Sequence, residues 1–508
     1  MKSEEKIKTL QELIAITRKL KSQGKKIVQT QGIFDIIHPG IIRHLDSAKS
    51  QGDVLISTVV RDIDVNKGPG YPIFTESLRA ENVASVECVD FVAIVEDPVP
   101  YESVKILKPD IFARGQKYDE RDPNVITKLH QEEEVIKVAG CKIHHTPGEV
   151  FSSRSIINRF LDIYSEETRN FLKNFKESFS AAKVISSLQQ LRDLKVLVIG
   201  DTIIDEYYYC EPMGKSLKDN LVVNRYLNDE SFAGGTLAVA NHIAGLCDEV
   251  HLVSLLGSKD SRECFIKGKL RPHITYNFFY NHKAPTIVKR RFIDHYLNQK
   301  LFELCYIDNV KLSDILESQI LEYIKRIINR YDLVLVADFG HGLITPGIIS
   351  LLEENSKILA VNVQTNGANA GYNMITKYHK ISYACIDEPE ARLACQDRYG
   401  DINTIIRDIS THIQADLLIV TRGKKGSSAL GMDSNFINTP AFASRVIDRI
   451  GAGDAYFAFT APCFARGFPV NLISFVGNAV GALAVQVVGN REPVEPQKLY
   501  EFIYTLIR

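Results

Sequence analysis

The chain has 508 residues, of which 45% are hydrophobic and 24% charged, and its 61 basic side chains balance 62 acidic ones. This length exceeds what one hydrophobic core supports, and two folding units are the best expectation. A net charge of −1 gives no field that would attract a nucleic acid or an anionic membrane, so small molecules are the expected partners. No segment approaches the roughly 20 uninterrupted apolar residues of a membrane span.

The amino-terminal segment and the cysteines indicate the compartment. Residues 1–20 have an amphipathic helical pattern without the apolar core of a signal peptide. Nine cysteines are scattered without a CxxC pair, which argues against a disulfide framework or a zinc site. We therefore expect a cytoplasmic protein.

Short β-type runs alternate with helical segments from Lys25 onward, which predicts a parallel sheet with helices on both faces. The segment 161–194 is polar and helix-prone and is expected to be a helical linker. The buried run KVLVIGD at Lys195 restarts the alternation, and it predicts a second α/β domain over 195–508 after a first one over 1–160. Three β-type runs, ITYNFFY, PTIVKRRFI and KLFELCYI, predict a small antiparallel appendage on the second domain.

The first predicted strand ends in GIFDIIHPGIIRHL. Gly32 permits a close backbone turn, and Pro39 suits a first helical position, so His38 is expected at a helix N-terminus. Unpaired amides and the helix dipole favour a triphosphate there. A lone histidine at such a place is more often a capping or core residue, so the motifs around it decide the interpretation.

Four motifs, GIFDIIHPG, VNKGPG, RGQKY and FSSRSII, resemble in order and spacing the cytidylyltransferase-like nucleotidyltransferases of HxGH type. The resemblance covers roughly residues 25–160 and implies a Rossmann-like parallel sheet. It implies that His38 stabilises the α-phosphate, that Lys67 neutralises phosphate charge, and that Ser152 and Ser153 hold the outgoing phosphates. The residues expected to bind the nucleotide, ATP or CTP, are Gly32, Phe34, Asp35, Gly40, Arg114, Gly115, Ser152 and Ser153.

One position departs from that family. Its second HxGH histidine falls at Ile41, which cannot donate a hydrogen bond to developing charge. His44 lies one turn further, roughly 4.5 Å along the helix axis, and is a displaced substitute that we do not favour. Losing one transition-state donor commonly costs ~10² to 10³ in rate, so we expect a weak, altered or inactive transferase.

The strongest motif is DRIGAGDAYFAF, in which Gly451, Ala452 and Gly453 lead into Asp454. Such glycines let amides form an anion nest, and the carboxylate can take a proton from an attacking hydroxyl. GAGD alone is more simply a turn capped by an aspartate. GAGD occurs together with GDTIID, AGG and TRGKKG, which precede it in that order. This set of motifs resembles the ribokinase-like PfkB carbohydrate kinases over about residues 195–508.

This second resemblance implies a ribokinase-like α/β sandwich in which Asp454 is the catalytic base. ATP and its phosphates are expected at Gly451, Ala452, Gly453, Thr421, Gly423 and Gly426. The sugar is expected at Asp205, Gly234, Gly235, Lys289 and Arg291, although for the cluster Lys289–Arg291 a solvated role is an equal alternative. Magnesium is expected near Glu390 and Asp387, through water.

The stretch from APTIVKRRFI to NQKLFELCYID and the run ADFGHG look most like the heptose 7-phosphate kinase part of the bifunctional heptose kinase/adenylyltransferases, with the domain order exchanged. Three departures point to a different acceptor: Ala238 replaces an asparagine, Asn362–Gln364 replaces Asp-Pro-Lys, and Asp387 replaces the asparagine of NxxE. Because Asp387 adds a carboxylate, magnesium handling can survive.

Three functions remain open. The first is a bifunctional sugar-phosphate kinase and sugar 1-phosphate nucleotidyltransferase that makes a nucleotide-activated, ADP-heptose-like sugar for cell-surface polysaccharide. The second is a sugar kinase with a degenerate, nucleotide-binding transferase domain. The third is a transferase acting on a polyol, lipid or flavin-type phosphate. A homodimer is also expected, because the antiparallel appendage would leave strand edges and an apolar face for pairing.

Overall fold

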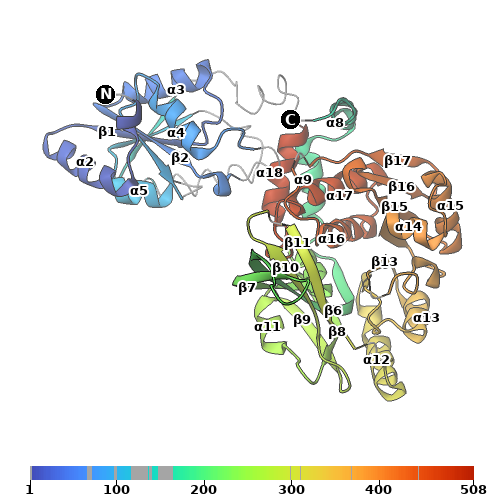
Figure 1. Cartoon of the computed structure of the whole chain (residues 1–508). Helices are drawn as coiled ribbons and strands as arrows, with labels where there is room; N and C mark the ends of the chain where they lie inside the picture. Colours follow the sequence, from blue (N-terminus) through green and yellow to red (C-terminus); the bar gives the residue numbers. More distant parts are fainter. Residues whose placement is uncertain are drawn as a thin grey trace. The chain divides into compact units, whose positions relative to one another are not determined.

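The computed structural model describes residues 3–65, 71–96, 100–115, 136, 140–146, 164–297, 299–308, 311–367, 369–443 and 445–507. Its internal contacts divide the chain into two compact units, Met1–Ser165 and Glu166–Arg508 (Figure 1). From residue 166 onward, the segment predicted as a linker contains two helices of the second unit, α8 (Glu166–Ser178) and α9 (Ala181–Gln189).

The first unit is built on a parallel sheet with strand order β3-β2-β1-β4-β5, as the alternating pattern predicts. Its strands are β1 (Ile27–Gly32), β2 (Val54–Val60), β3 (Phe91–Val95), β4 (Ile111–Gly115) and β5 (Lys142–Thr146). Its helices are α1 (Ser3–Lys6), α2 (Leu10–Ser22), α3 (Pro39–Lys49), α4 (Glu76–Ala84) and α5 (Tyr101–Leu107), with a 3-10 turn at Asp62–Asp64. The strand order reverses between β1 and β4, and open parallel sheets bind ligands at such a switch point.

Apolar side chains cover both faces of this sheet, which is why β2 (VLISTVV) and β3 (FVAIV) are nearly continuous apolar runs. On one face, Leu45 of α3 and Val83 of α4 pack with Val28 and Leu55. On the other face, helices α2 and α5 pack with Ile27, Val54 and Ile56. All seven residues of β2 are buried as a result.

The second unit is organised by one strand of 21 residues, β6 (Lys195–Lys215). Its first part pairs in parallel with β8 and β12, and its second part pairs antiparallel with β7 and parallel with β10. The long strand therefore carries the chain from the main sheet into a smaller sheet, which β11 completes by antiparallel pairing with β10. The other strands are β7 (Val222–Gly235), β8 (Glu249–Gly257), β9 (Ile274–Asn281), β10 (Ile287–Asp294), β11 (Gln299–Tyr306), β12 (Leu333–Asp338), β13 (Leu359–Val363), β14 (Tyr383–Asp387), β15 (Leu417–Thr421), β16 (Ser427–Gly431) and β17 (Phe436–Thr439).

The antiparallel appendage exists, but one of its predicted runs was placed wrongly. ITYNFFY forms β9, which pairs in parallel with β8 in the main sheet. Helix α11 (Glu263–Lys269) lies between β8 and β9, so this connection is a βαβ crossover and not a hairpin. The appendage is instead formed by the second part of β6 with β7, β10 and β11.

Helices cover the main sheet on both sides (Figure 1). Residues of α12 (Asp314–Ile327), α13 (Pro346–Asn355) and α15 (Ile402–His412) belong to one large apolar cluster with β12 to β15. Helix α16 (Ala452–Ala465) contacts β12, β13 and β14 as well as the buried helices α10 (Thr236–Ile243) and α17 (Val470–Ala484). The remaining helices are α14 (Glu388–Ala394) and α18 (Pro496–Ile507), with 3-10 turns at Ile328–Arg330, Ile375–Lys377 and Gly423–Lys425. In the part of the chain that the structure describes, no helix combines the length and apolar character needed to cross a membrane.

Candidate active sites

The predicted transferase residues gather where β1 ends and α3 begins, at the switch point of the sheet. His38 is 5% exposed and is the N-cap of α3, and its Nδ1 accepts a hydrogen bond of 3.1 Å from the Gly40 amide. Pro39 is the first residue of that helix, as predicted. The amides that begin α3 are paired within the chain, that of Gly40 with His38 Nδ1 and those of Ile41 and Ile42 with the His38 carbonyl oxygen, so the helix dipole is what would attract a phosphate to this end.

Gly32 and Phe34 shape the loop between β1 and His38. Phe34 has a left-handed φ of 52°, and a Cβ at Gly32 would lie only 3.0 Å from its ring. The absence of a side chain at Gly32 therefore lets the Phe34 ring fold back over the strand end, where it is 7% exposed. Phe34 packs in the core cluster with Val28 and Leu45, so it anchors the loop to the apolar core.

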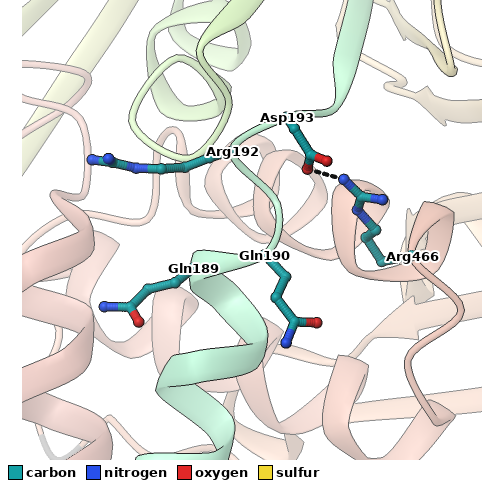
Figure 2. Close-up of a pocket in the computed structure, with 5 residues that line it drawn as sticks. All are labelled: Gln189, Gln190, Arg192, Asp193 and Arg466. Atoms are coloured by element: carbon teal, nitrogen blue, oxygen red, sulfur yellow. Dashed lines mark hydrogen bonds and ion pairs between the residues drawn. The ribbon is translucent and has the colours of Figure 1, made fainter.

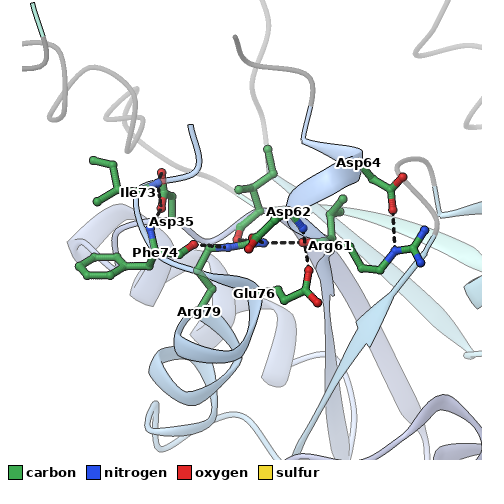
Figure 3. Close-up of polar contacts among 10 residues, drawn as sticks. Asp35, Arg61, Asp62, Asp64, Ile73, Phe74, Glu76 and Arg79 are labelled. Carbon is green, nitrogen blue, oxygen red and sulfur yellow. Dashed lines mark hydrogen bonds and ion pairs between the residues drawn. The ribbon is translucent and has the colours of Figure 1, made fainter. Parts of the chain in front are cut away.

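Asp35 is held by the backbone rather than left open for a ligand. Its carboxylate accepts hydrogen bonds from the amides of Ile73, at 2.9 Å, and Phe74, at 3.0 Å (Figure 3). These bonds tie the loop that carries His38 to the segment preceding α4. Asp35 was predicted to bind nucleotide, and this geometry gives it the role of fixing the loop.

Arg79 of α4 is a functional candidate that the sequence reasoning missed. Its side chain is fully buried, and its guanidinium donates to the carbonyl oxygens of Ile33 and Val60, at 2.5 and 2.7 Å, and to Asp62 at 2.6 Å (Figure 3). It therefore joins the ends of β1 and β2 beneath the site. No sequence signal separates such an arginine from one on a solvated helix face.

The neighbouring strand β4 brings Arg114 and Gly115 to the same edge of the sheet. Between them and β1 stands His44, whose Nε2 lies 2.8 Å from the Thr30 hydroxyl and whose Nδ1 lies 2.7 Å from the Thr146 hydroxyl. Both ring nitrogens are thus engaged by threonines at the strand ends. Ile41 instead packs against the apolar core. Lys67, Ser152 and Ser153 lie outside the described residues.

The predicted kinase base, Asp454, lies in the first turn of α16, immediately after the glycine segment. It is 4% exposed, and its Oδ1 accepts a hydrogen bond of 2.9 Å from Nε2 of Gln364. Burial, followed by the charge of Asp205, raises its pKa to about 7, and the charge of Lys289 acts in the opposite direction. A carboxyl group with this pKa can accept a proton near neutral pH.

The glycine segment before Asp454 has the backbone that an anion nest requires. Gly451 is the N-cap of α16 with a φ of 81°, and a Cβ there would collide with Asn490 at 2.1 Å. A Cβ at Gly453 would meet nothing within 4 Å, so the first turn of the helix faces open space. Ala452 lies between them as the first helical residue. Free amides and a helix dipole converge there on the space beside Asp454.

The predicted sugar side lies where β6 leaves the main sheet. Asp205 is buried, and its carboxylate accepts hydrogen bonds from Arg291 at 2.5 Å and from the side-chain amide of Asn490 at 3.2 Å. A Cβ at Gly234 would lie only 2.1 Å from this carboxylate. Gly235 has a φ of 56° and begins the turn into α10. The absence of a side chain at Gly234 therefore gives the Asp205 carboxylate the space that it occupies.

The predicted ATP residues follow the end of β15. Thr421 is the last residue of that strand, and Gly423 and Gly426 have left-handed φ values of 57° and 84°. A Cβ at Gly426 would lie 1.9 Å from the Thr439 carbonyl oxygen, whereas one at Gly423 would meet nothing within 4 Å. Gly426 is thus required by the turn, and Gly423 faces open space where a ligand could approach.

Asp387 and Glu390 form a capping box at the start of α14. The Asp387 carboxylate accepts from the Glu390 amide at 2.7 Å, and Glu390 accepts from the amides of Asp387, at 2.8 Å, and Thr365, at 2.9 Å. Burial, followed by the charge of Asp387, raises the pKa of Glu390 to about 8. Among the described residues, no three His, Cys, Asp or Glu side chains converge as a ready metal cage.

A surface pocket of about 450 Å³ lies apart from these residues, between the end of α9 and the start of β6 (Figure 2). It is lined by Gln189, Gln190, Arg192, Asp193 and Arg466, and an ion pair between Asp193 and Arg466 crosses it. None of the predicted site residues contributes to this pocket.

Comparison with known proteins agrees with this fold. The family model of the pfkB family carbohydrate kinases matches residues 193–498. The chain belongs to this family. A cytidylyltransferase-like model matches residues 30–159, so the predicted fold class, two α/β domains of these types, is confirmed. An exchanged domain order relative to bifunctional relatives is not evident from these matches.

Curated relatives match parts of this chain. The chain is 46% identical to the bifunctional protein HldE of Nitratiruptor sp. over 118 residues, which are 23% of this chain and 26% of that protein. It is 25% identical to the bifunctional protein HldE of Trichlorobacter lovleyi over 312 residues, covering 60% of this chain and 62% of the relative. Several of these matches thus span only about a quarter of the relatives' length, as with the 25% of HldE from Aliarcobacter butzleri.

Among solved structures, phosphofructokinase-2 from Escherichia coli in complex with substrates and products is similar with a TM-score of 0.50 and 13% identity, covering 61% of this chain and 99% of that one. At this identity the likeness concerns the fold of the kinase part alone.

The bond from Gln364 to Asp454 generates the first prediction. An amide donor favours the ionised carboxylate, so Gln364→Leu is expected to raise the pKa of Asp454 and to shift the acidic limb of the kcat/KM profile for phosphoryl transfer to higher pH. Gln364→Lys places a cation there and is expected to shift the same limb to lower pH. Opposite shifts identify Gln364 as a positioning residue, whereas equal losses of rate without a shift would contradict this role.

Proposed function

We propose that the second unit is an ATP-dependent kinase that phosphorylates a hydroxyl of a sugar phosphate. The observation that carries this proposal is Asp454, a buried carboxylate with a pKa of about 7 beside the open amides at the start of α16. The side chain of Asn490, which a Cβ at Gly451 would strike, donates to Asp205 of the small sheet, so the glycine segment beside the base lies next to a polar group for an acceptor. Membership in the carbohydrate kinase family supports the same chemistry.

In the proposed step, an acceptor hydroxyl oxygen attacks the γ-phosphorus of ATP while Asp454 takes the hydroxyl proton. The bond from the γ-phosphorus to the bridging oxygen breaks, and ADP leaves. The amides of Gly451, Ala452 and Gly453 would offset charge on the transferring group, and Thr421, Gly423 and Gly426 would line the nucleotide side.

The acidic pair at α14 fits a magnesium ion that accompanies the nucleotide. Burial raises the pKa of both carboxyl groups, the charge of Asp387 also raises that of Glu390, and a nearby divalent cation would stabilise their ionised forms. Because the Glu390 oxygens accept backbone amides, contact through water is the better fit. When bound, the ion would supply neutralisation of phosphate charge.

We propose that the first unit is a nucleotidyltransferase that uses a sugar 1-phosphate. A phosphate oxygen of the sugar would attack the α-phosphorus of ATP or CTP, and the bond to the β-phosphate would break and release pyrophosphate. His38 at the N-terminus of α3 would contact the α-phosphate, and Arg114 at the end of the neighbouring strand β4 would contribute positive charge. Lys67, Ser152 and Ser153 keep their proposed phosphate roles from the motif resemblance.

Together the two steps would produce a nucleotide-activated sugar of the ADP-heptose type, as proposed from the motifs, in the cytoplasm. The alternative is a kinase whose first unit only binds nucleotide, for which Ile41 in the core is the one supporting observation. The cytidylyltransferase-like match and the bifunctional relatives favour the two-activity proposal.

We also propose a homodimer formed through the small sheet. β11 is the edge strand of the described part of that sheet, and its alternating residues Phe302, Leu304 and Tyr306 are 50%, 46% and 43% exposed. An unpaired strand edge with an apolar face is favourable to cover with a second copy.

Replacement of the base tests the kinase proposal. Asp454→Asn is expected to abolish phosphoryl transfer to sugar phosphates, because the amide cannot accept the proton. The folded protein binds the Asp454 proton up to about pH 7, against an ordinary pKa of 3.8, so ionisation costs stability above pH 7. At pH 8 the variant should therefore be more stable than the native protein, by up to about 4 kcal/mol in the free energy of unfolding, and should unfold at a higher temperature. Below pH 4, where Asp454 is protonated in the folded and the unfolded native protein, both proteins should unfold at the same temperature. Turnover at a near-native rate would refute the assignment.

Pyrophosphate release from a sugar 1-phosphate with ATP or CTP tests the transferase proposal in the full chain. His38→Ala is expected to lower the rate by ~10² or more, because it removes a group at the α-phosphate. Ile41→His is expected to raise the rate, and Ile42→His, on the exposed side of the same helix, serves as the matched control. If no nucleotide yields pyrophosphate, even with Ile41→His, the transferase proposal is wrong and the kinase proposal stands alone.

Light scattering after size exclusion tests the dimer. Leu304→Glu places a charge on the exposed face of β11 and is expected to convert a dimer into monomers. Ile315→Glu on α12, where the side chain is 75% exposed, is the matched control and should leave the mass unchanged. A native protein that runs as a monomer at all concentrations would contradict the proposal.

A further inference from the structure

Helix α8 packs on the rest of the second unit through a largely apolar face. Thr168, Leu172, Phe175 and, directly after the helix, Phe179 recur at helical spacing and are each between 3% and 8% exposed. The helix contacts α18 (Figure 1). The pfkB family model matches residues 193–498, so α8 precedes the matched residues, yet it belongs to the second compact unit. The kinase unit therefore contains a helix that the family model does not include.

Four aromatic rings connect α8 to the interior of this unit in a closed cluster. They belong to Phe171 and Phe175 of α8, Phe475 of α17, and Phe442, which follows β17. The ring centroids of Phe171 and Phe442 are 6.0 Å apart, and those of Phe442 and Phe475 are 5.5 Å apart. Phe475 stacks on Phe175 at 4.1 Å, and Phe175 stacks on Phe171 at 5.9 Å. Phe442, which is 1% exposed, is thus held between a ring of α8 and a ring of α17.

Phe442 lies on the segment that joins the two elements predicted to bind ATP. Just before it, the Pro440–Ala441 peptide lies against Gly426, because a Cβ at Gly426 would be 2.6 Å from the carbonyl carbon of Pro440 and 2.7 Å from the nitrogen of Ala441. The same segment continues to Gly451, where the GAGD motif begins. A shift of Phe442 would therefore move the backbone that packs against the Gly426 turn.

The ends of this segment are fixed by the backbone, and its middle is fixed by Phe442. Thr439 pairs in the sheet as the last residue of β17, and the Ile447 amide donates to the carbonyl oxygen of the residue that caps α17, at 2.8 Å. Of the described residues from 441 to 447, Phe442 alone is buried. Apolar packing of this one ring is what anchors the middle of the segment, and Phe171 supplies part of that packing.

We propose that α8 is a structural part of the kinase nucleotide site and that Phe171 is a positioning residue for ATP. Its ring holds Phe442, which keeps the Pro440–Ala441 peptide against the Gly426 turn on the nucleotide side. The inference rests on the proposed kinase function and adds that ATP binding depends on a helix preceding the matched family residues. Loss of the ring would loosen the nucleotide side and leave the base, Asp454, in place.

Replacement of Phe171 tests this role in the full chain. Phe171→Ala is expected to raise the KM for ATP by about two- to tenfold, the range that one aromatic contact contributes, with kcat within about twofold of the native value. Phe171→Tyr keeps the ring and should keep the native KM. Phe179→Ala is the matched control, because its ring stacks on Phe175 at 4.8 Å and lies outside the four-ring cluster. It should lower the melting temperature without changing the KM for ATP.

Hydrogen exchange localises the effect and does not require turnover. With magnesium, a non-hydrolysable ATP analogue is expected to slow exchange in native peptides that contain residues 421–427, and Phe171→Ala should need a higher analogue concentration for the same protection. If the analogue does not protect these peptides in the native chain, the proposed kinase nucleotide site is wrong, and this inference with it. If they are protected and Phe171→Ala changes neither the protection nor the KM, or if Phe179→Ala raises the KM equally, α8 has no specific role at the nucleotide and the inference alone is wrong.

Discussion

The burial of one ionisable carboxylate sets the design of the second unit. In its proposed role as a base, Asp454 is withdrawn from water, and withdrawal beside Asp205 disfavours its ionised form. Nearby positive charge from Lys289 and the amide of Gln364 work in the opposite direction. The balance keeps the pKa of the Asp454 carboxyl group close to neutral pH. At that pH a substantial fraction of the group is ionised, and the ionised group is basic enough to take a proton.

The long strand β6 makes this balance possible. In the first part of β6, Asp201 accepts a hydrogen bond from the backbone amide of His341. Four residues later, Asp205 forms an ion pair with Arg291. One continuous strand thus fixes the carboxylates that organise the loop after β12 and the cations of β10. A hinge within β6 would let those groups move independently, whereas pairing on both sides along its length keeps them in register.

Much of the architecture could be predicted because it depends on local patterns. Apolar runs alternating with helical segments gave both parallel sheets, and Pro39 with His38 marked the start of α3. The run forming β9 was misplaced because period and composition do not distinguish a parallel edge strand from a hairpin strand. Arg79 and Gln364 could not be found in the same way, because each acts through a contact with residues distant in the sequence, such as Ile33 and Asp454.

The first unit shows why a missing motif residue does not by itself decide activity. Ile41 gives apolar packing to α3 where a histidine would have given a donor, and one turn later His44 is bonded by Thr30 and Thr146 at the ends of β1 and β5. An imidazole with both nitrogens engaged is well placed to brace the ends of two strands and poorly placed to follow a moving phosphate oxygen. The transferase chemistry proposed for this unit therefore depends on His38 and the dipole of α3 more heavily than two histidines would require.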